Sequence, residues 1–274
     1  MIRLLDAGFT RLRKNKIFWI SSAFSVILAL GMVFMGFNDI KKYNSIVEVE
    51  QLMLNYSIVI GILIAVFTSL FLGSEYSDGA IRNKVSIGHK RSSIYLSNLT
   101  IIIVVSLFLY LLFIAVAALV GIPLLGQINM ELSLLASILG CIFVAVIAYA
   151  SIFTFLAMII SNKTTTAIVS ILSAFVMLMF ALTCTSILEA PENILETSII
   201  NGKIESKAVP NPKYPSEGKR KLYQFFLDIN PTGQMLQLTR EFNQNMYLLP
   251  LYSSGILVVF TGVGLILFKK KSLK

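Results

Sequence analysis

The amino-acid sequence predicts an all-α polytopic membrane protein with six transmembrane helices, on the evidence of its composition and of the spacing of its charges. Hydrophobic residues make up 56% of the 274 residues, charged residues make up 14%, and the mean hydropathy is +0.81. Because a soluble domain usually carries about 25% charged residues, this composition excludes a disordered chain, a disulfide scaffold and a soluble enzyme. Asp, Glu, Lys and Arg are absent from six intervals longer than 20 residues: 17–38, 51–74, 92–130, 132–162, 164–188 and 242–268.

Each charge-free interval predicts one membrane span, since charged side chains are costly in hydrocarbon and about 20 helical residues cross a core of about 30 Å. The interval 92–130 is too short for two spans. We therefore expect one span there, followed by a break at Gly121-Ile122-Pro123, because proline stops a helix. The apolar stretch after this break has room to re-enter the membrane. The expected spans are about 17–37, 55–74, 97–119, 133–160, 165–188 and 246–268.

The distribution of basic residues predicts the orientation of the chain in the membrane. An even number of spans puts both termini on one side. With the N-terminus in the cytoplasm, the inner segments hold 14 of the 23 Lys and Arg residues and three acids (Asp6, Glu75 and Asp78), whereas the outer segments hold 9 basic and 11 acidic residues. The positive-inside rule therefore predicts that both termini are cytoplasmic. Contact with anionic membrane lipid accounts for the net charge of +9, and no nucleic-acid partner is indicated.

The first 16 residues predict an amphipathic helix that lies on the inner face of the membrane, with a bend at 14–16 (Lys-Asn-Lys) before the first span. The alternative is that these residues are merely the start of that span, but three successive polar residues would enter hydrocarbon reluctantly. Apolar residues recur at the three- and four-residue spacing of one helix face, namely Ile2, Leu5, Phe9 and Leu12.

The longest outer segment, 189–241, contains five of the seven prolines and is the only sizeable soluble stretch. Its closely spaced prolines predict irregular, extended chain over 210–215. Thr232, which follows Pro231, predicts the N-terminal cap of a short helix over about 233–243. We expect this helix to lie against the outer leaflet just before the last span.

The sequence contains no motif for chemistry of its own. There is no G-x-x-x-x-G-K-[ST] for nucleotide binding and no H-E-x-x-H for a zinc protease. The predicted spans hold no ionisable side chain for a proton or ion relay. Two cysteines, Cys141 and Cys184, and one histidine, His89, are too few for a structural Cys/His zinc site. We therefore expect no catalytic residue, no metal and no cofactor in this chain, and we expect the two cysteines to be buried as small apolar side chains.

The segment 75–93 after the second span predicts a short cytoplasmic helix rather than a plain loop. Ser77 or Asp78 is suited to cap this helix, and Gly88 is suited to end it. Ile81 and Val85 are four residues apart and therefore fall on one face.

This segment resembles the first cytoplasmic loop of ABC-2-type permeases, the membrane subunits of bacterial ATP-binding cassette exporters. The residues that carry the resemblance read E-Y-S-D-G-A-I-R-N-K from Glu75, followed by G-H-K-R-S-S-I-Y-L-S from Gly88. Many members of that family have E-Y-x-x-G-T-I-R-N-K, so Ala80 stands where threonine is common. The six spans, the basic N-terminal helix, the long last outer loop and N-P-T-G-Q at 230–234 extend the resemblance over nearly the whole chain.

The resemblance implies one transmembrane domain over 1–274 in the bacterial cytoplasmic membrane. It also implies pairing with a second permease chain, identical or different, and with a dimer of ATPase subunits that bind Mg-ATP. The short helix would be a coupling helix that docks into the ATPase, with Ile81 entering an apolar pocket and Arg82 and Lys84 pairing with acids. The residues implied to bind the partner are Glu75, Tyr76, Gly79, Ile81, Arg82, Asn83 and Lys84.

The resulting hypothesis is a permease subunit that exports an amphipathic substrate, such as a drug, a lipid or an antimicrobial peptide. The alternative is a non-transporting immunity or sensor protein of the membrane that acts through its extracellular loop. An intramembrane enzyme is disfavoured because ionisable residues are missing at membrane depth. The loop motif says little about the substrate and leaves the direction of transport open.

Overall fold

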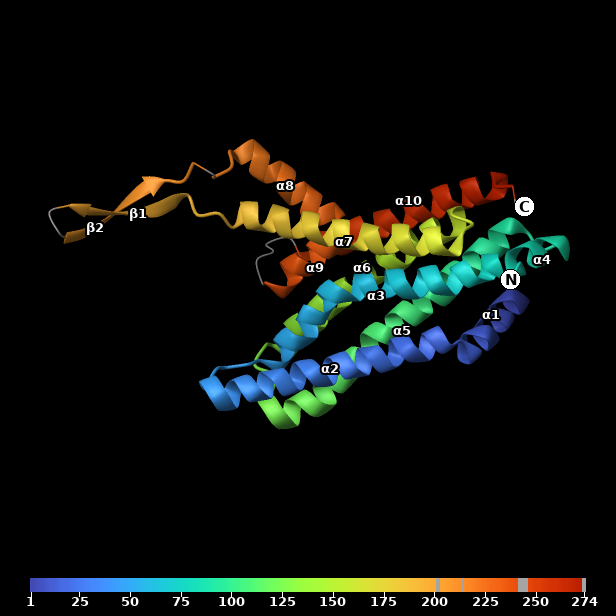
Figure 1. The fold of residues 1–274 in the computed structure, drawn as a ribbon, viewed down its shortest axis with the longest axis horizontal. Coiled ribbons are helices and arrows are strands. Elements are labelled where there is room, and N and C mark those ends of the chain that lie inside the picture. The colour runs from blue at the N-terminus through green and yellow to red at the C-terminus, as the bar shows by residue number, and fades with distance from the viewer. Residues whose placement is uncertain (201–202, 213, 241–245, 273–274) are drawn as a thin grey trace.

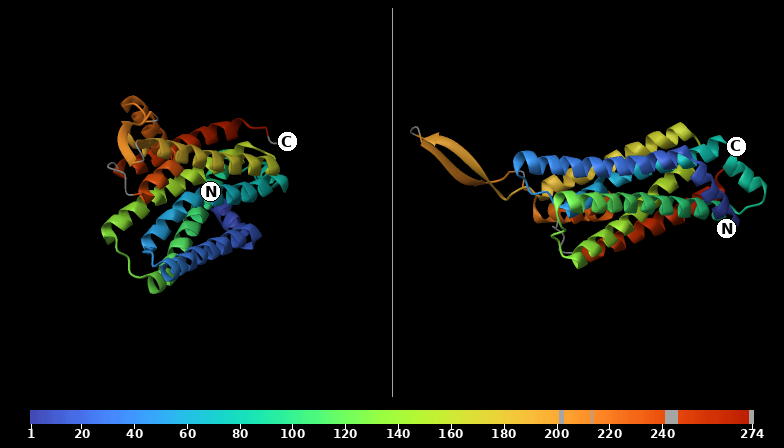
Figure 2. Two further views of the ribbon diagram at one scale, coloured as in Figure 1. Left: turned by 60° about the vertical axis from the view of Figure 1, so that its left-hand side comes forward. Right: turned by 90° about the horizontal axis from the view of Figure 1, so that it is seen from below.

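The computed structural model describes residues 1–200, 203–212, 214–240 and 246–272. It is an elongated helical bundle with both termini at one end and a β-hairpin that projects from the other end (Figures 1 and 2). Six helices of the described chain are long and apolar enough to cross a membrane, which confirms an all-α polytopic membrane protein with six candidate spans. They are α2 (Lys16–Tyr43), α3 (Val49–Ser77), α5 (Arg91–Leu125), α6 (Leu132–Ile159), α7 (Lys163–Leu188) and α10 (Leu249–Lys270).

The core of the bundle forms around α3 and α6, which are the most deeply buried of the six helices. Within this core, the Tyr56 ring of α3 stacks on Phe113 of α5 at a centroid distance of 3.7 Å. The Tyr56 hydroxyl forms a hydrogen bond with Ser25 Oγ at 3.0 Å, so its polar end is satisfied inside the bundle. The outer helices α2, α7 and α10 instead expose large apolar side chains, as expected for surfaces that face lipid.

The expected break after the third span is wrong, because α5 continues through Pro123 and ends at Leu125. Proline lacks only one backbone donor, and at this position the loss falls within the last turn of the helix. Gly121 is packed so closely that a Cβ there would lie 3.1 Å from Val49 Cγ1. This packing holds the end of α5 in the bundle, and a short connection over 126–131 leads directly to α6 without a re-entrant loop.

A separate amphipathic helix, α1 (Ile2–Lys14), precedes the first span, as predicted. The bend lies at Asn15, which is extended and whose Oδ1 accepts a hydrogen bond from Ile17 N at 2.8 Å, so that it caps α2. The predicted apolar face is rotated, however, and Ile2 is exposed. The buried face packs on α5 and is formed by Leu4, Gly8 and Leu12. The absence of a side chain at Gly8 allows this close packing, since a Cβ there would overlap Ile101.

The helix α3 begins at Val49, six residues before the predicted start of the second span, and carries Glu50 into the bundle. Glu50 is 1% exposed, and its Oε1 accepts hydrogen bonds from Asn129 N and Met130 N, both at 2.9 Å. A carboxylate that was expected in an outer loop is therefore buried in the first turn of α3. It holds the connection between α5 and α6 against that helix.

The outer segment also contains two antiparallel strands, β1 (Asn193–Ile200) and β2 (Lys203–Pro210), which the expectation of helices alone missed. Asn193 pairs with Pro210 at one end of the ladder, and Ile200 pairs with Lys203 at the other. Pro210 is the last residue of its strand, a position at which its missing N–H is tolerated. The described residues of 211–215 are irregular, as expected, whereas Lys213 lies outside the described residues.

The expected helix before the last span exists as α9 (Pro231–Thr239), but it does not lie on the membrane surface. It packs against α3, α6 and α7, and all but one of its nine residues are buried. Its cap is Asn230 rather than Thr232, because Asn230 Oδ1 accepts a hydrogen bond from Thr232 N at 3.1 Å. The predicted positions 241–243 lie outside the described residues.

We expect short helices in this outer segment, and a second one, α8 (Glu217–Ile229), whose bounds the sequence did not indicate, precedes α9 and forms a helical hairpin with it. The hairpin is held by polar contacts that satisfy its buried groups. Asn230 Nδ2 donates to Met177 O of α7 at 2.8 Å, the Thr232 hydroxyl bonds to Tyr149 of α6, and Ser253 Oγ of α10 donates to Gln234 Oε1 at 2.6 Å. A segment that lies inside a membrane bundle without spanning it needs such hydrogen-bond partners for its polar groups.

The close contact between α8 and the first turn of α9 leads to a prediction for Gly233→Ala. A Cβ at Gly233 would lie 2.5 Å from Leu227 O and 2.8 Å from Leu227 Cα, so the backbone itself would have to move. We expect a loss of about 1–3 kcal/mol in the free energy of unfolding, measured as a lower melting temperature of the purified protein in detergent. Gly140→Ala is the control, because a Cβ there meets nothing within 4 Å. Equal melting temperatures for the two variants would contradict the tight hairpin.

Candidate partner-docking site

A sharp turn at Gly79 joins α3 to the short helix α4 (Ala80–Ser86) at the end of the bundle that holds both termini (Figure 1). Gly79 has φ 69°, a left-handed conformation that glycine adopts without strain. Ser77 and Asp78 do not cap α4, so that expectation is wrong. The last turn of α3 extends through Ser77, and Gly79 occupies the cap position without a side-chain hydrogen bond.

The predicted end of α4 at Gly88 is confirmed. Gly88 has φ 94°, and its N–H donates to Val85 O at 3.0 Å, while His89 N donates to Lys84 O at 3.1 Å. These two bonds form the Schellman arrangement that ends a helix at a left-handed glycine. The short helix is thus bounded at both ends by a glycine in the left-handed conformation, which glycine adopts without strain.

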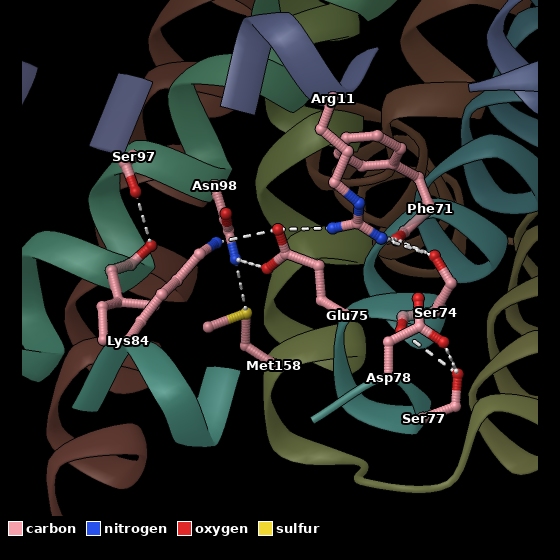
Figure 3. Close-up of polar contacts among 11 residues, drawn as sticks. Arg11, Phe71, Ser74, Glu75, Ser77, Asp78, Lys84, Ser97, Asn98 and Met158 are labelled. Atoms are coloured by element: carbon pink, nitrogen blue, oxygen red, sulfur yellow. Dashed lines mark hydrogen bonds and ion pairs between the residues drawn. The ribbon is translucent and has the colours of Figure 1, made fainter. Parts of the chain in front are cut away.

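The side chain that organises this end of the bundle is Glu75, which is 1% exposed (Figure 3). Its Oε1 lies 2.5 Å from Arg11 Nη1 of α1 and 2.8 Å from Lys84 Nζ of α4. Its Oε2 accepts a hydrogen bond from Asn98 Nδ2 of α5 at 2.9 Å. Asn98 Nδ2 also lies 3.5 Å from the sulfur of Met158 on α6. One carboxylate on α3 therefore bonds to three further helices, α1, α4 and α5, and Asn98 extends the contacts to α6.

Arg11 is fixed by more than its ion pair. Its Nη2 donates to Ser74 Oγ at 2.6 Å and to Phe71 O at 3.2 Å, and its guanidinium lies 4.8 Å from the centre of the Phe71 ring. A planar, multiply bonded guanidinium holds α1 in one orientation on α3. We call the set of Arg11, Glu75, Lys84 and Asn98 the Glu75 cluster.

A second polar group beside the Glu75 cluster fixes the end of α10. The Tyr76 hydroxyl donates to Met158 O at 2.5 Å, and Lys271 Nζ lies 2.9 Å from the same hydroxyl and 3.0 Å from Met158 O. Arg91 Nη1, at the start of α5, donates to Phe268 O at 3.2 Å and also bonds to Lys271 O. Burial lowers the pKa of Lys271 to about 8, so its amine is partly neutral near physiological pH.

Apart from Gly79, which forms the turn before α4, the residues implied to bind the partner divide into two groups. Glu75 and Tyr76 lie in α3 and bond within the chain, Ile81 is 1% exposed in the main hydrophobic core, and Lys84 is paired with Glu75. Ile81 and Lys84 therefore do not have the free side chains expected of them. The exposed group contains Arg82 and Asn83, together with Ser86 and Ile87, which the sequence analysis did not single out.

The sequence reasoning also missed Arg11 and Asn98 as members of the Glu75 cluster. Arg11 is 64 positions from Glu75 and has the appearance of one more basic residue at the inner membrane face. Asn98 lies within an apolar span, where an uncharged amide attracts little notice. A buried polar side chain inside a span usually has a partner, and that is the signal that would have found Asn98.

Nothing among the described residues resembles a metal centre, since no group of three His, Cys, Asp or Glu side chains is close enough to hold an ion. Cys141 and Cys184 are buried free cysteines in α6 and α7. What this end of the molecule offers is an exposed short helix whose inner face is locked to the bundle. Such a helix is suited to dock against another protein.

A model of the family described as "ABC-2 family transporter protein" matches residues 4–181. This is more than half of the chain, and it includes the Glu75 cluster, α4 and most of α1 and α7. The chain belongs to the ABC-2 transporter family. It is thus a permease-type, multi-pass membrane component of an ABC transporter, and the family implies partnership with an ABC ATPase. The comparison with curated proteins finds no match. The family match ends before β1, α8 and α9.

Glu75→Gln tests the importance of the cluster in this ABC-2 protein. The substitution leaves Arg11 and Lys84 without their counter-ion, and unpairing a buried charge costs about 3–5 kcal/mol. We expect a clearly lower melting temperature in detergent and faster proteolysis of α1. Asp78→Asn is the matched control, because Asp78 is exposed and its carboxylate accepts a local hydrogen bond from the neighbouring Ser77 at 3.3 Å. Equal stability of the two variants would show that the cluster contributes little.

The docking of Lys271 predicts a pH dependence. Its pKa is about 8 when docked and near 10.5 when solvated, so the undocked tail binds more protons between these values. Docking therefore becomes more favourable as the pH rises from about 8 to about 10.5. A nitroxide attached to Ser272→Cys should lose mobility between pH 8 and pH 10, and the same label in Lys271→Met should not. A label whose mobility is independent of pH in both proteins would contradict this docking.

Proposed function

We propose that this chain is the permease subunit of an ABC exporter for an amphipathic substrate, with ATP hydrolysed by a separate dimer of partner subunits. The observation that carries the proposal is the architecture of α4, which has one face locked to the bundle and the other exposed. The exposed face carries a cation, Arg82, and an apolar side chain, Ile87, which is 78% exposed. An exposed apolar side chain can fill a pocket of a partner protein, and an exposed cation can pair with its acids.

The contacts of α4 support a role in transmitting movement. Ile81 is buried among the core residues, and Lys84 bonds directly to Glu75 on α3. Force applied to the exposed face would therefore be passed to α3 and, through Arg11 and Asn98, to α1 and α5. Because packed interiors deform little, α4 would move with these helices as one body. This is the behaviour required of a coupling helix.

The proposed docking contacts differ in two respects from those that the resemblance implied. Ile87, rather than Ile81, is available to enter an apolar pocket of the ATPase subunit. Arg82, rather than Lys84, is available to pair with its acids. Asn83 lies beside Arg82 on the same exposed surface and would add a hydrogen bond.

The proposal includes an orientation with both termini in the cytoplasm of a bacterium. The termini, α1 and α4 gather at one end of the bundle, and the basic residues near them outnumber the acidic ones (Figure 1). The positive-inside rule supports the cytoplasmic side for this end. A second permease chain, identical or different, would pair with this one in the plasma membrane. The exposed apolar sides of α2 and α7 offer surfaces for such pairing or for lipid.

A second candidate function is a non-transporting immunity or sensor protein that acts through the outer segment. The β-hairpin favours this candidate, because it projects beyond the bundle into the surroundings (Figure 2). The two candidates differ in their need for ATP hydrolysis. Inactivating the ATPase subunit abolishes the activity of an exporter and leaves that of a sensor, whereas deletion of 193–210 abolishes that of the sensor.

The docking surface is tested by co-purification of the tagged chain with the ATPase encoded beside it, in mild detergent. We expect Arg82→Glu and Ile87→Ser to reduce the recovered ATPase about tenfold, because each removes one central contact of the interface. The melting temperature of the permease should not change in either variant. Lys219→Glu is the control, since it reverses the same charge at the opposite end of the bundle.

Ile81→Ser should give the converse result. Ile81 is buried in the chain's own core, so its replacement should cost about 2–5 kcal/mol of stability in the permease alone. Normal recovery of the ATPase with both Arg82→Glu and Ile87→Ser would contradict the proposed docking surface. Purification of the wild-type chain without any ATP-hydrolysing protein would contradict the proposed function itself.

A further inference from the structure

A cavity of about 590 Å³ lies between α7, α8 and α9, at the end of the bundle opposite to α4. Its floor is apolar and buried, with Leu227 of α8 and Leu236 of α9 each 2% exposed. Its rim is polar and includes Arg220 and Gln224 of α8 and Arg240, which follows α9. A volume in this range, an apolar floor and a few convergent polar groups are the usual features of a small-molecule site.

Arg220 has the features of a group prepared for an anion. The guanidinium lies 5.0 Å from the centre of the Tyr214 ring, which fixes its plane. Its Nη1 is buried and has no hydrogen-bond acceptor among the described residues, and no described carboxylate forms an ion pair with it. Burying a guanidinium nitrogen without an acceptor is unfavourable. An anion that entered the cavity would supply the missing acceptor.

The other cations at the cavity and beside it form ion pairs. Arg240 pairs with Glu189, and Lys221 pairs with Glu217 at 2.8 Å. The carboxylate of Asp228, beside the cavity, accepts a hydrogen bond from Gln224 at 2.8 Å. Among the described residues at the rim, Arg220 is thus the cation that has no carboxylate partner. A single cation above an apolar floor favours a ligand that has one anionic group and an apolar part.

The surroundings of the cavity favour a ligand from the membrane. A smaller hollow of about 430 Å³ adjoins the cavity, shares Arg220, Gln224 and Leu188 with it, and reaches Phe225 and Tyr252. Beside it, α8 exposes Leu222, Phe225 and Ile229, at the spacing of one helix face. An apolar tail could follow this face while the headgroup reaches Arg220.

We propose that the cavity binds the anionic headgroup of a membrane amphiphile, with Arg220 as the principal charged contact. The inference names the substrate class of the proposed exporter and rests on that function for the step of transport. Binding itself requires neither the ATPase nor α4. Failure of binding would leave the docking experiments intact, and failure of docking would leave the binding site intact.

The test uses the full chain in an uncharged detergent with a photoreactive dioctanoyl phosphatidylglycerol, and maps the crosslinks by mass spectrometry. We expect crosslinks in peptides of α8 and the C-terminal part of α7. Arg220→Gln should reduce them about tenfold, since it removes a charge-assisted contact. Lys219→Gln, which removes the same charge one residue away and does not line the cavity, should leave them unchanged. Crosslinks near the basic α1 serve as an internal control for folding and lipid access.

Competition and a variant of opposite sign complete the test. Unlabelled dioctanoyl phosphatidylglycerol should compete, whereas glycerol 3-phosphate, which lacks the tails, and dioctanoylglycerol, which lacks the charge, should compete poorly. Glu189→Gln removes the anion that pairs with Arg240 and should increase crosslinking about threefold. Equal competition by glycerol 3-phosphate would indicate a free-anion site, and equal competition by dioctanoylglycerol would indicate an apolar groove. Either result, or crosslinks that do not depend on Arg220, would overturn the inference.

Discussion

The buried carboxylate of Glu75 is the constraint on which this end of the molecule depends. A carboxylate that is 1% exposed must be compensated, and its partners come from three other helices, α1, α4 and α5. The ion pair with Arg11 determines how α1 lies on the bundle, and the ion pair with Lys84 determines how α4 lies on α3. Because Glu75 holds Lys84 on the inner face of α4, the opposite face of this helix is the one that is exposed.

The outer half of the molecule meets a different constraint, the satisfaction of backbone and amide groups inside a bundle of apolar helices. The segment 230–234 enters the bundle because its polar side chains, Asn230, Thr232 and Gln234, each have a partner on α6, α7, α8 or α10. Asn230 alone caps α9 with its Oδ1 and bonds to Met177 O with its Nδ2. Gly233 allows α8 and α9 to approach closely. Without these contacts, the same segment would be more stable on the membrane surface, where water satisfies it.

The sequence predicts the features of this fold that depend on local composition. Charge-free intervals give the six spans, and the left-handed Gly88 ends α4 as its position indicates. Features that depend on distant partners escape prediction: the pairing of Arg11 with Glu75, the burial of Glu50, and the inward position of α9. The hairpin is an intermediate case. Isoleucines at 199, 200 and 204 flank Asn201-Gly202, a dipeptide that favours a hairpin, but the prolines that follow favour irregular chain.

The long helix α3 relates the two ends of the molecule to each other. It is held by a buried carboxylate near each end, Glu50 and Glu75, and it contacts both α4 and α9. At its outer end, Gln51 Nε2 donates to Thr239 O, the last residue of α9, at 3.3 Å. The helix α9 in turn supplies Leu236 to the floor of the outer cavity. Because a packed helix transmits displacement with little deformation, a shift of α4 against the bundle would move one wall of that cavity. The carboxylates at both ends make α3 suited to this role, since each fixes the helix to the elements that it would have to move.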